Sequence, residues 1–371
     1  VNSTNSNLKT KAINRIVLDM IETVKQKEVG IPFIILVVDN YTAAILSYYL
    51  TMSDILNMGI FNIESLEKKR KPYPNYSAIY FVSPSKESCK HIEEDFSDPT
   101  NPSYNQAHIY FSSRVLDTQL NLLATEHLAY RVSSVKELNV SYFSHNNCFN
   151  LRQPSTQLWG YLSSNFNNER RNTLNSIKDK LMTVIVSMKE FPYIQYQETK
   201  LCTELASMVN GGLHELNEIK LLNPDRRSIC LIVDRTIDMV SPVLHDYSYK
   251  ALLYDLFNVD KQGFLNIPAE GITMYKLDEK DTIWTKYKNS HIGEVFNNIQ
   301  QDVEEFQKSD LAKKDDNNME NFDDMIKAVE GVKGYRERLK QLNVHLKVCN
   351  KILKLFPANN LYEIIELEQK I

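Results

Sequence analysis

Short apolar runs alternate with helical stripes from Leu8 to Phe143, and this alternation limits the folds open to the chain. The clearest run, Phe33 to Val38, is apolar throughout and ends at Asp39, which favours a strand buried on both faces. Four further strands are expected: Ile60 to Ile63, Ala78 to Val82, His108 to Phe111 and Leu138 to Phe143. Helices are expected before and between the strands: Leu8 to Val29, Thr42 to Leu50, Ser85 to Phe96 and Leu116 to Glu126. This order predicts an α/β fold with a parallel, doubly wound sheet.

A stretch rich in Asn and Ser, Asn146 to Asn168, marks the end of this first domain. Helices are expected at Thr173 to Glu190 and at Cys202 to Val209, with Gly211 and Gly212 as a C-cap. The apolar run Ile229 to Val233 then predicts a buried strand. One strand is too little sheet for a core, so other chain is expected to complete this domain. The predicted domains are 1–145, 146–245 and 246–371.

The third domain is predicted to be mainly helical. His291 to Phe306 carries apolar residues on one face, and the polar gap from Lys308 to Asn321 is expected to be a mobile loop. A short helix, Phe322 to Val329, is expected next. Beyond it an apolar residue recurs every three or four positions and ends before Pro357: Tyr335, Leu339, Leu342, Leu346, Cys349, Leu353 and Phe356. Such a heptad seam favours a helical hairpin.

Composition excludes several classes of function. The chain has 371 residues and a formal net charge of −4. It therefore lacks the strong positive field that would attract nucleic acids. Its five cysteines are scattered without a CxxC pair, which argues against a metal clip or a disulfide framework and favours the cytoplasm. The start, Val1 to Lys11, is polar, unlike a signal peptide. The longest apolar run is far too short to span a membrane.

Neither nucleotide nor metal chemistry has a strong signal. No GxGxxG or GxxxxGK[ST] motif is present, so no cofactor is predicted. An enzyme would have to use Asp234, Asp238 and His245 near a strand end, as a metal-dependent or acid/base hydrolase. The alternative is structural, with Asp234 and Arg235 as an ion pair and Asp238 capping a turn. The basic run Lys68 to Lys71 either meets an acidic partner or phospholipid, or is a solvated loop.

Several motifs together resemble one family. The stretch LIVDRTIDMVSPVLHDYSYKALLYDLF is similar to the signature of the SM proteins, the syntaxin-binding Sec/Munc proteins of vesicle fusion. IILVVDNYTAAILSYYL, SAIYFVSPSKES, FSDPTNPSYNQAHIYFSS, HIGEVFNNIQQDVEEF and YRERLKQLNVHLKVCNKIL also look like parts of this family, in the same order. The resemblance covers nearly the whole chain and leans to the exocytic, plasma-membrane branch. Within the signature, Asp234, Arg235, Asp238, Ser241, Pro242 and His245 are taken as structural.

The resemblance implies an arch of three domains whose second domain is discontinuous, so this chain would stop before that domain is completed. The first and third domains of the family clasp a syntaxin. Asp39, Glu64, Lys68 and Lys69 match the residues that face it. Ala44 and Thr51 stand where neuronal members carry Arg and Lys, and losing two cations weakens the case for a tight clasp of closed syntaxin.

Two further surfaces are implied by the resemblance. A pocket for the syntaxin N-terminal peptide would be formed by Val115, Leu120, Leu123 and Glu137, with Glu137 pairing a peptide Arg. The hairpin would offer a SNARE surface through Lys333, Gly334, Tyr335, Leu339, Leu342 and Leu346. Gly331 and Gly334 flank Lys333, where neuronal members have Pro, which predicts a softer hinge.

Together the resemblance and the residues predict a non-enzymatic SNARE-binding regulator of vesicle docking and membrane fusion in exocytosis. Its expected partners are a syntaxin-type SNARE, the assembled SNARE complex and, through the hairpin, a vesicle SNARE. It would be a monomer that binds no nucleic acid. It would be cytoplasmic and recruited peripherally to the plasma membrane by syntaxin.

Overall fold

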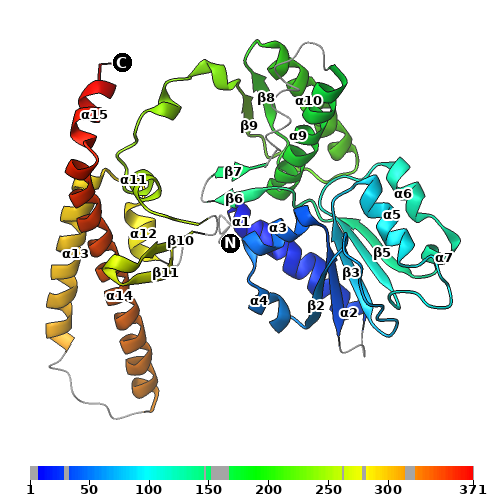
Figure 1. Ribbon diagram of the computed structural model, residues 1–371, viewed down its shortest axis with the longest axis horizontal. Helices are drawn as coiled ribbons and strands as arrows, with labels where there is room; N and C mark the ends of the chain where they lie inside the picture. Colours follow the sequence, from blue (N-terminus) through cyan, green and yellow to red (C-terminus); the bar gives the residue numbers. More distant parts are fainter. Residues whose placement is uncertain are drawn as a thin grey trace. The chain divides into compact units, whose positions relative to one another are not determined.

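The computed structural model (Figure 1) describes residues 7–28, 33–145, 148–151, 167–260, 263–277, 281–313 and 322–370. Side chains are described within these ranges except at residues 145, 167, 269 and 306–335. The chain divides into two compact units, Val1–Asp234 and Arg235–Ile371. Each unit is described by itself.

The first unit is built on a five-stranded sheet in the order β2-β1-β3-β4-β5, with every neighbouring pair parallel. Its strands are β1 (Ile34–Val38), β2 (Ile60–Ser65), β3 (Ser77–Val82), β4 (Ala107–Phe111) and β5 (Val132–Glu137). Side chains of β1 alternate between two cores: Ile34, Leu36 and Val38 pack on one face, and Ile35 and Val37 on the other. This confirms the predicted doubly wound sheet.

Helices cover both faces of the sheet. One face is covered by the helical segment α1 (Leu8–Asn14), η1 (Arg15–Glu22) and α2 (Thr23–Lys27), together with α3 (Asn40–Tyr49). The other is covered by α5 (Lys86–Glu94), α6 (Asp117–Leu123) and α7 (Glu126–Ala129). The short α4 (Met52–Asn57) precedes β2. The helices expected at Leu8 to Val29, Thr42 to Leu50, Ser85 to Phe96 and Leu116 to Glu126 are thus present, whereas α4 and α7 were not predicted.

The fifth strand was predicted at the wrong place. It is Val132–Glu137, whereas Leu138–Phe143 is a buried, irregular segment that leads into the hairpin β6 (Phe143–His145) and β7 (Cys148–Asn150). The sequence of β5, VSSVKE, is polar because this strand lies at the edge of the sheet and leaves much of its surface exposed. Hydrophobicity alone therefore pointed to the buried segment beside it.

Two longer helices follow, α9 (Asn167–Met188) and α10 (Lys200–Glu218). The predicted C-cap at Gly211–Gly212 is wrong, because α10 continues through both glycines. A Cβ on Gly212 would lie 3.1 Å from Sδ of Met182 on α9. Gly212 thus allows α9 and α10 to pack closely against each other.

A two-stranded parallel ribbon ends the first unit, β8 (Tyr193–Tyr196) with β9 (Ile229–Ile232). β8 was missed, since YIQY is short and half polar. β9 was expected to be buried, but Ile229 and Leu231 are each 63% exposed. The opposite face of β9 packs Ile232 against the core between α9 and α10.

The second unit holds five α-helices and one β-hairpin within its described residues. They are α11 (Tyr249–Leu256), β10 (Phe264–Ile267), β11 (Ile272–Lys276), α12 (Thr282–Tyr287), α13 (Ile292–Lys313), α14 (Phe322–Ala358) and α15 (Leu361–Glu368). The hairpin was not predicted. Its turn places Gly271 at φ +69°, a conformation that glycine adopts without strain.

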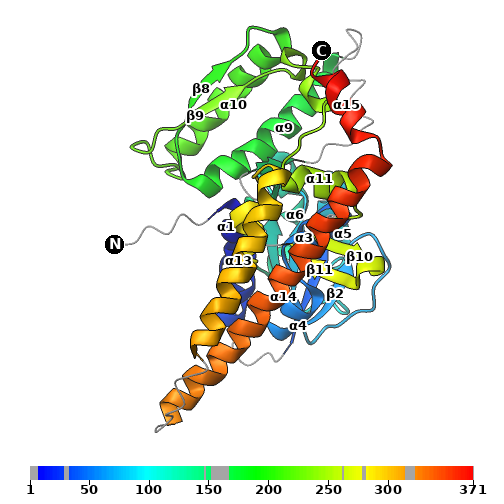
Figure 2. The same ribbon diagram turned by 90° about the vertical axis from the view of Figure 1, so that its left-hand side faces the viewer.

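The predicted helical hairpin is present, and Figures 1 and 2 both show α13 and α14 side by side. The loop expected from Lys308 to Asn321 is wrong at its start, because α13 remains helical to Lys313; residues 314–321 lie outside the described part. Instead of breaking at Gly331 and Gly334, α14 runs helically through both. Glycine lowers helix propensity without forbidding a helix, so these two residues do not end α14.

Candidate functional site

The four residues predicted for a peptide pocket converge on one cavity in the first unit. Val115, Leu120, Leu123 and Glu137 all line a pocket of about 500 Å³. Its other lining residues are Ala124, Ala129, Val132, Val135 and Lys136. These side chains come from α6, α7, β5 and the segments beside them, so residues distant in the sequence meet at one edge of the sheet.

Glu137 shapes the polar end of this pocket. The register of β4 with β5 pairs Phe111 with Glu137, which brings the carboxylate beside the segment that leaves β4. There Glu137 Oε1 accepts a hydrogen bond of 2.9 Å from the Val115 N–H. A carboxylate can accept several hydrogen bonds, so Glu137 keeps capacity for a cationic ligand group. An apolar floor with one half-buried acid suits a segment that carries an apolar anchor and a basic residue.

Among the predicted syntaxin-facing residues, Asp39 has a structural role. It is buried, and its carboxylate caps α3 by accepting from Thr42 N at 2.8 Å and Thr42 Oγ1 at 2.9 Å. The other oxygen accepts from the Ser83 N–H. Both oxygens of Asp39 therefore serve the fold, and we leave this residue out of the proposed partner surface.

The other three predicted residues lie on and after β2. Glu64 is half-buried and accepts a 2.8 Å hydrogen bond from the Tyr104 hydroxyl. Lys68 and Lys69 are exposed. Their neighbour Arg70 is fixed in place because its guanidinium bonds both oxygens of Asp95, at 2.8 and 2.6 Å. The basic run thus consists of an anchored arginine flanked by exposed lysines.

Ala44 and Thr51, which stand where neuronal members carry cations, have roles within the fold. Ala44 lies on α3 and is half-buried against the core. Thr51 caps α4 by accepting from Asp54 N at 3.2 Å, and its own N–H donates to the Asp54 carboxylate at 3.0 Å. Neither residue offers a cation to a partner.

The hydrolase alternative needs a cluster that the structure does not assemble. His245 Nδ1 pairs with Glu368 Oε1 at 2.6 Å, and the backbone N–H of His245 donates to the same oxygen at 3.1 Å. Asp238 Oδ1 accepts from Val240 N at 3.1 Å and Ser241 N at 3.0 Å, which confirms its predicted turn-capping role. A hydrogen bond from the Ser241 side chain, followed by the one from its backbone N–H, lowers the pKa of Asp238.

The remaining signature residues make local contacts. Arg235 pairs with Asp238 at 3.9 Å and also donates to its carbonyl oxygen, so the ion pair seen for Arg235 differs from the predicted pair with Asp234. The Asp234 N–H donates to Gln197 Oε1 at 2.9 Å. Ser241 and Pro242 begin a short helical turn, Ser241–Val243. Across the described residues, His, Cys, Asp and Glu form no group of three or more able to hold a metal.

The predicted hairpin surface is only partly available to a partner. Lys333, Gly334 and Tyr335 lie in the helical backbone of α14, and their side chains fall outside the described ones. Leu342 is buried inside the unit, and Leu339 and Leu346 are half-buried. Leu342, Cys349 and Phe356 of the predicted heptad seam are buried, whereas Leu353 is exposed. The buried stripe is Leu342, His345, Val348, Cys349, Ile352 and Phe356.

A buried polar network at the centre of the second unit was missed. His345 Nδ1 contacts the Tyr249 hydroxyl at 2.7 Å, and Nε2 contacts Asp281 Oδ2 at 2.8 Å. Asp281 also caps α12 by accepting from Trp284 N at 2.9 Å. Burial by itself would raise the pKa of Asp281. The hydrogen bond with His345 and the other hydrogen bonds to the carboxylate outweigh burial, so the pKa lies below its usual value. A histidine inside an apolar stripe was the one sequence signal for this network.

The model of the Sec1 family matches residues 34–371, so the chain belongs to the Sec1 family. This confirms the resemblance to SM proteins.

The curated relatives agree with this assignment. Protein transport protein sec1 of Dictyostelium discoideum is 27% identical over 96% of this chain and 60% of its own length. Protein transport Sec1a of Arabidopsis thaliana is 26% identical over 91% of this chain and 53% of its own length. A vacuolar protein sorting-associated protein 45 of Dictyostelium discoideum is also similar, at 23% over 91% of this chain and 59% of its own length. The chain therefore spans less than two thirds of these relatives.

Solved structures share the fold. The Unc18–syntaxin 1 complex from Monosiga brevicollis is 25% identical with a TM-score of 0.73, over 94% of this chain and 63% of that chain. The SM protein Vps45, solved in complex with the Qa SNARE Tlg2, has the same TM-score at 23% identity, over 98% of this chain and 63% of that chain. Among the described residues of this protein, no helix is long and apolar enough to cross a membrane.

Proposed function

We propose that this chain binds a syntaxin-type SNARE and regulates vesicle fusion, with no covalent chemistry of its own. Membership of the Sec1 family and the convergence of Val115, Leu120, Leu123 and Glu137 on one pocket support the proposal. The pocket would take an N-terminal SNARE peptide, with its apolar residue on the leucines and its basic residue on Glu137. The hydrolase alternative is dropped, because His245 pairs with Glu368.

The finer assignments are part of this proposal. The exocytic branch is supported by the Sec1 names among the relatives. Glu64, Lys68 and Lys69 are proposed as further partner contacts, because Lys68 and Lys69 are exposed and Glu64 is not fully buried. Leu339 and Leu346 are proposed for the SNARE surface of the hairpin, with recruitment to the plasma membrane by syntaxin. Further strands are proposed to complete the sheet to which β9 belongs.

The peptide pocket is tested by removing the charge of Glu137 while keeping its structural bond. In Glu137→Gln the amide oxygen can still accept from Val115 N–H, but the ion pair with a basic peptide residue is lost. We expect affinity for the N-terminal peptide of a syntaxin from the same cell to fall about tenfold, since hydrogen bonds to charged groups contribute roughly 1.5–3 kcal/mol. Fluorescence anisotropy of labelled peptide measures this change.

Glu126→Gln is the matched control, because Glu126 is an exposed acid at the start of α7 and does not line the pocket. It should bind the peptide as the parent protein does. Equal affinity of Glu137→Gln and the parent would remove Glu137 from the site. Absence of binding to every syntaxin, by the peptide and by the whole cytosolic domain, would overturn the proposed function.

A further inference from the structure

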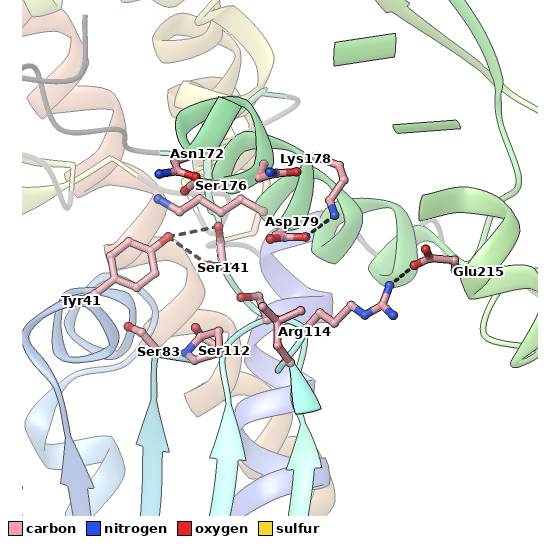
Figure 3. A pocket seen from close by; sticks show the side chains of 15 residues that line it. Tyr41, Ser83, Ser112, Arg114, Ser141, Asn172, Ser176, Lys178, Asp179 and Glu215 are labelled. Atoms are coloured by element: carbon pink, nitrogen blue, oxygen red, sulfur yellow. Dashed lines mark hydrogen bonds and ion pairs between the residues drawn. The ribbon is translucent and has the colours of Figure 1, made fainter. Parts of the chain in front are cut away.

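A second, larger pocket of about 680 Å³ lies at the carboxyl edge of the sheet. The segments that follow β1, β3 and β4 supply one wall, and α9 supplies the opposite wall, as Figure 3 shows. In the order β2-β1-β3-β4-β5, the connection after β1 leads to the neighbouring strand on one side, and the connection after β3 leads to the neighbouring strand on the other. Open α/β sheets bind their ligands in the crevice beside such a switch point. This pocket shares no lining residue with the peptide pocket.

Ser112 gives the pocket a buried hydroxyl that the fold does not use. It is 1% exposed, and its Oγ has no hydrogen-bond partner within the part of the chain that the structure describes. Its backbone N–H, by contrast, donates to Val82 O at 2.9 Å and extends the strand pairing. A buried hydroxyl without a partner costs free energy. A ligand that accepts a hydrogen bond would remove this cost.

The rest of the lining is polar and carries more cationic than acidic side chains. Hydroxyl and amide groups recur around the pocket: Ser83, Ser113, Ser141, Ser176, Asn172 and Asn175. Arg114 pairs with Glu215, and Lys178 with Asp179 at 2.8 Å.

Lys180 is the third cation of the lining. Its Nζ donates to Leu151 O at 3.1 Å and lies 4.7 Å from the centre of the Tyr41 ring. Burial of the ammonium group lowers the pKa of Lys180. An anion bound beside it would favour the charged form.

We propose that this pocket binds a small molecule carrying a phosphate group, with the Ser112 hydroxyl donating to a phosphate oxygen and Lys180 balancing its charge. Phosphate fits because its several acceptor oxygens match a wall of hydroxyl donors and a cation. A dinucleotide held at the start of α3 does not fit, since the Asn40 N–H already donates to Glu67 Oε1 and the Thr42 N–H to Asp39 Oδ1. The site is independent of the proposed SNARE function.

Calorimetric titration of the full chain tests the proposal with three probes: glucose 6-phosphate, inorganic phosphate and glucose. We expect glucose 6-phosphate to bind more tightly than phosphate, and glucose not to bind. Ser112→Ala should weaken glucose 6-phosphate binding about tenfold, the size of one hydrogen bond to a charged group. The same variant should keep or slightly raise the melting temperature, because it removes an unsatisfied hydroxyl.

Ser144→Ala is the matched control. Ser144 is also a buried serine whose Oγ has no partner among the described residues, but it does not line this pocket. It should leave affinity unchanged. If Ser112→Ala fails to fold, Lys180→Gln provides the same test and should weaken binding and reduce its dependence on salt. Titrating inositol 1,4-bisphosphate and vesicles containing phosphatidylinositol 4-phosphate distinguishes a soluble ligand from a lipid headgroup.

Three results would overturn the proposal. The first is no heat from either phosphate compound at about 10 mM, a concentration that would nearly saturate a site with a Kd of about 1 mM. The second is equal binding of glucose and glucose 6-phosphate, which would show that phosphate is not recognised. The third is an equal effect of Ser112→Ala and Ser144→Ala on affinity.

Discussion

At the scale of single residues, burial decides what each polar side chain does. His108 lies on β4 inside the sheet, where Nε2 contacts Glu28 Oε1 at 2.7 Å and Nδ1 contacts Ser134 Oγ at 3.0 Å. Burial lowers the pKa of His108 below 6.5, and the hydrogen bond to Glu28 only partly opposes it. The neutral ring is therefore the form that the folded first unit accommodates.

His108 predicts an acid sensitivity of the first unit. A histidine with a lowered folded pKa binds fewer protons when folded, so its stabilising effect is complete above pH 6.5 and is lost as pH falls through the folded value. Urea unfolding between pH 7.5 and 5 should show stability falling as acid is added. His108→Gln should flatten this slope, whereas the exposed His127→Gln should not. A slope that His108→Gln leaves unchanged would contradict the assignment.

At the scale of elements, β9 shows how a strand can be apolar and still exposed. Ile229 and Leu231 form a row on its open face, and Ile232 packs on the other. Exposed apolar rows on short sheets favour association with other chains.

We expect the double variant Ile229→Thr with Leu231→Thr to reduce self-association, measured by light scattering, with little change in unfolding free energy. Threonine retains strand propensity. Ile232→Thr on the packed face is the control, and should lose about 1 kcal/mol or more of stability. A large loss from the double variant would mean that the open face is covered in solution.

Helix α14 gives a second prediction at this scale. Because Gly331 and Gly334 lie within its helical backbone, Ala at either position should stabilise the helix by about 1 kcal/mol. Hydrogen exchange of α14 amides should slow accordingly. Ala328→Gly, in the same helix, should speed exchange by a similar factor. Faster exchange in Gly331→Ala or Gly334→Ala would favour the hinge that the sequence suggested.

At the scale of the whole molecule, the chain has separate cores on either side of Asp234. The first unit is organised around its sheet, with Ile79 among its fully buried residues. The second is organised around α13, α14 and the Tyr249–His345–Asp281 network, with Ile352 fully buried. Cores that share no residues can unfold separately.

Calorimetry of the full chain should therefore resolve two unfolding transitions. Ile79→Ala should lower only one of them and Ile352→Ala only the other, since each leaves a cavity that costs about 2–5 kcal/mol. One transition that both variants shift would show that the units unfold together.

The sequence by itself determined most of the sheet, most helices and the family, because those signals lie in runs of neighbouring residues. The edge strand β5, the strand β8 and the hairpin β10–β11 escaped it, since short or polar strands carry little periodicity. Only the tertiary structure decided that Asp39 caps a helix, that His345 is buried and that Ser112 faces a pocket. Burial and hydrogen bonding depend on residues far apart in the chain, which periodicity does not report.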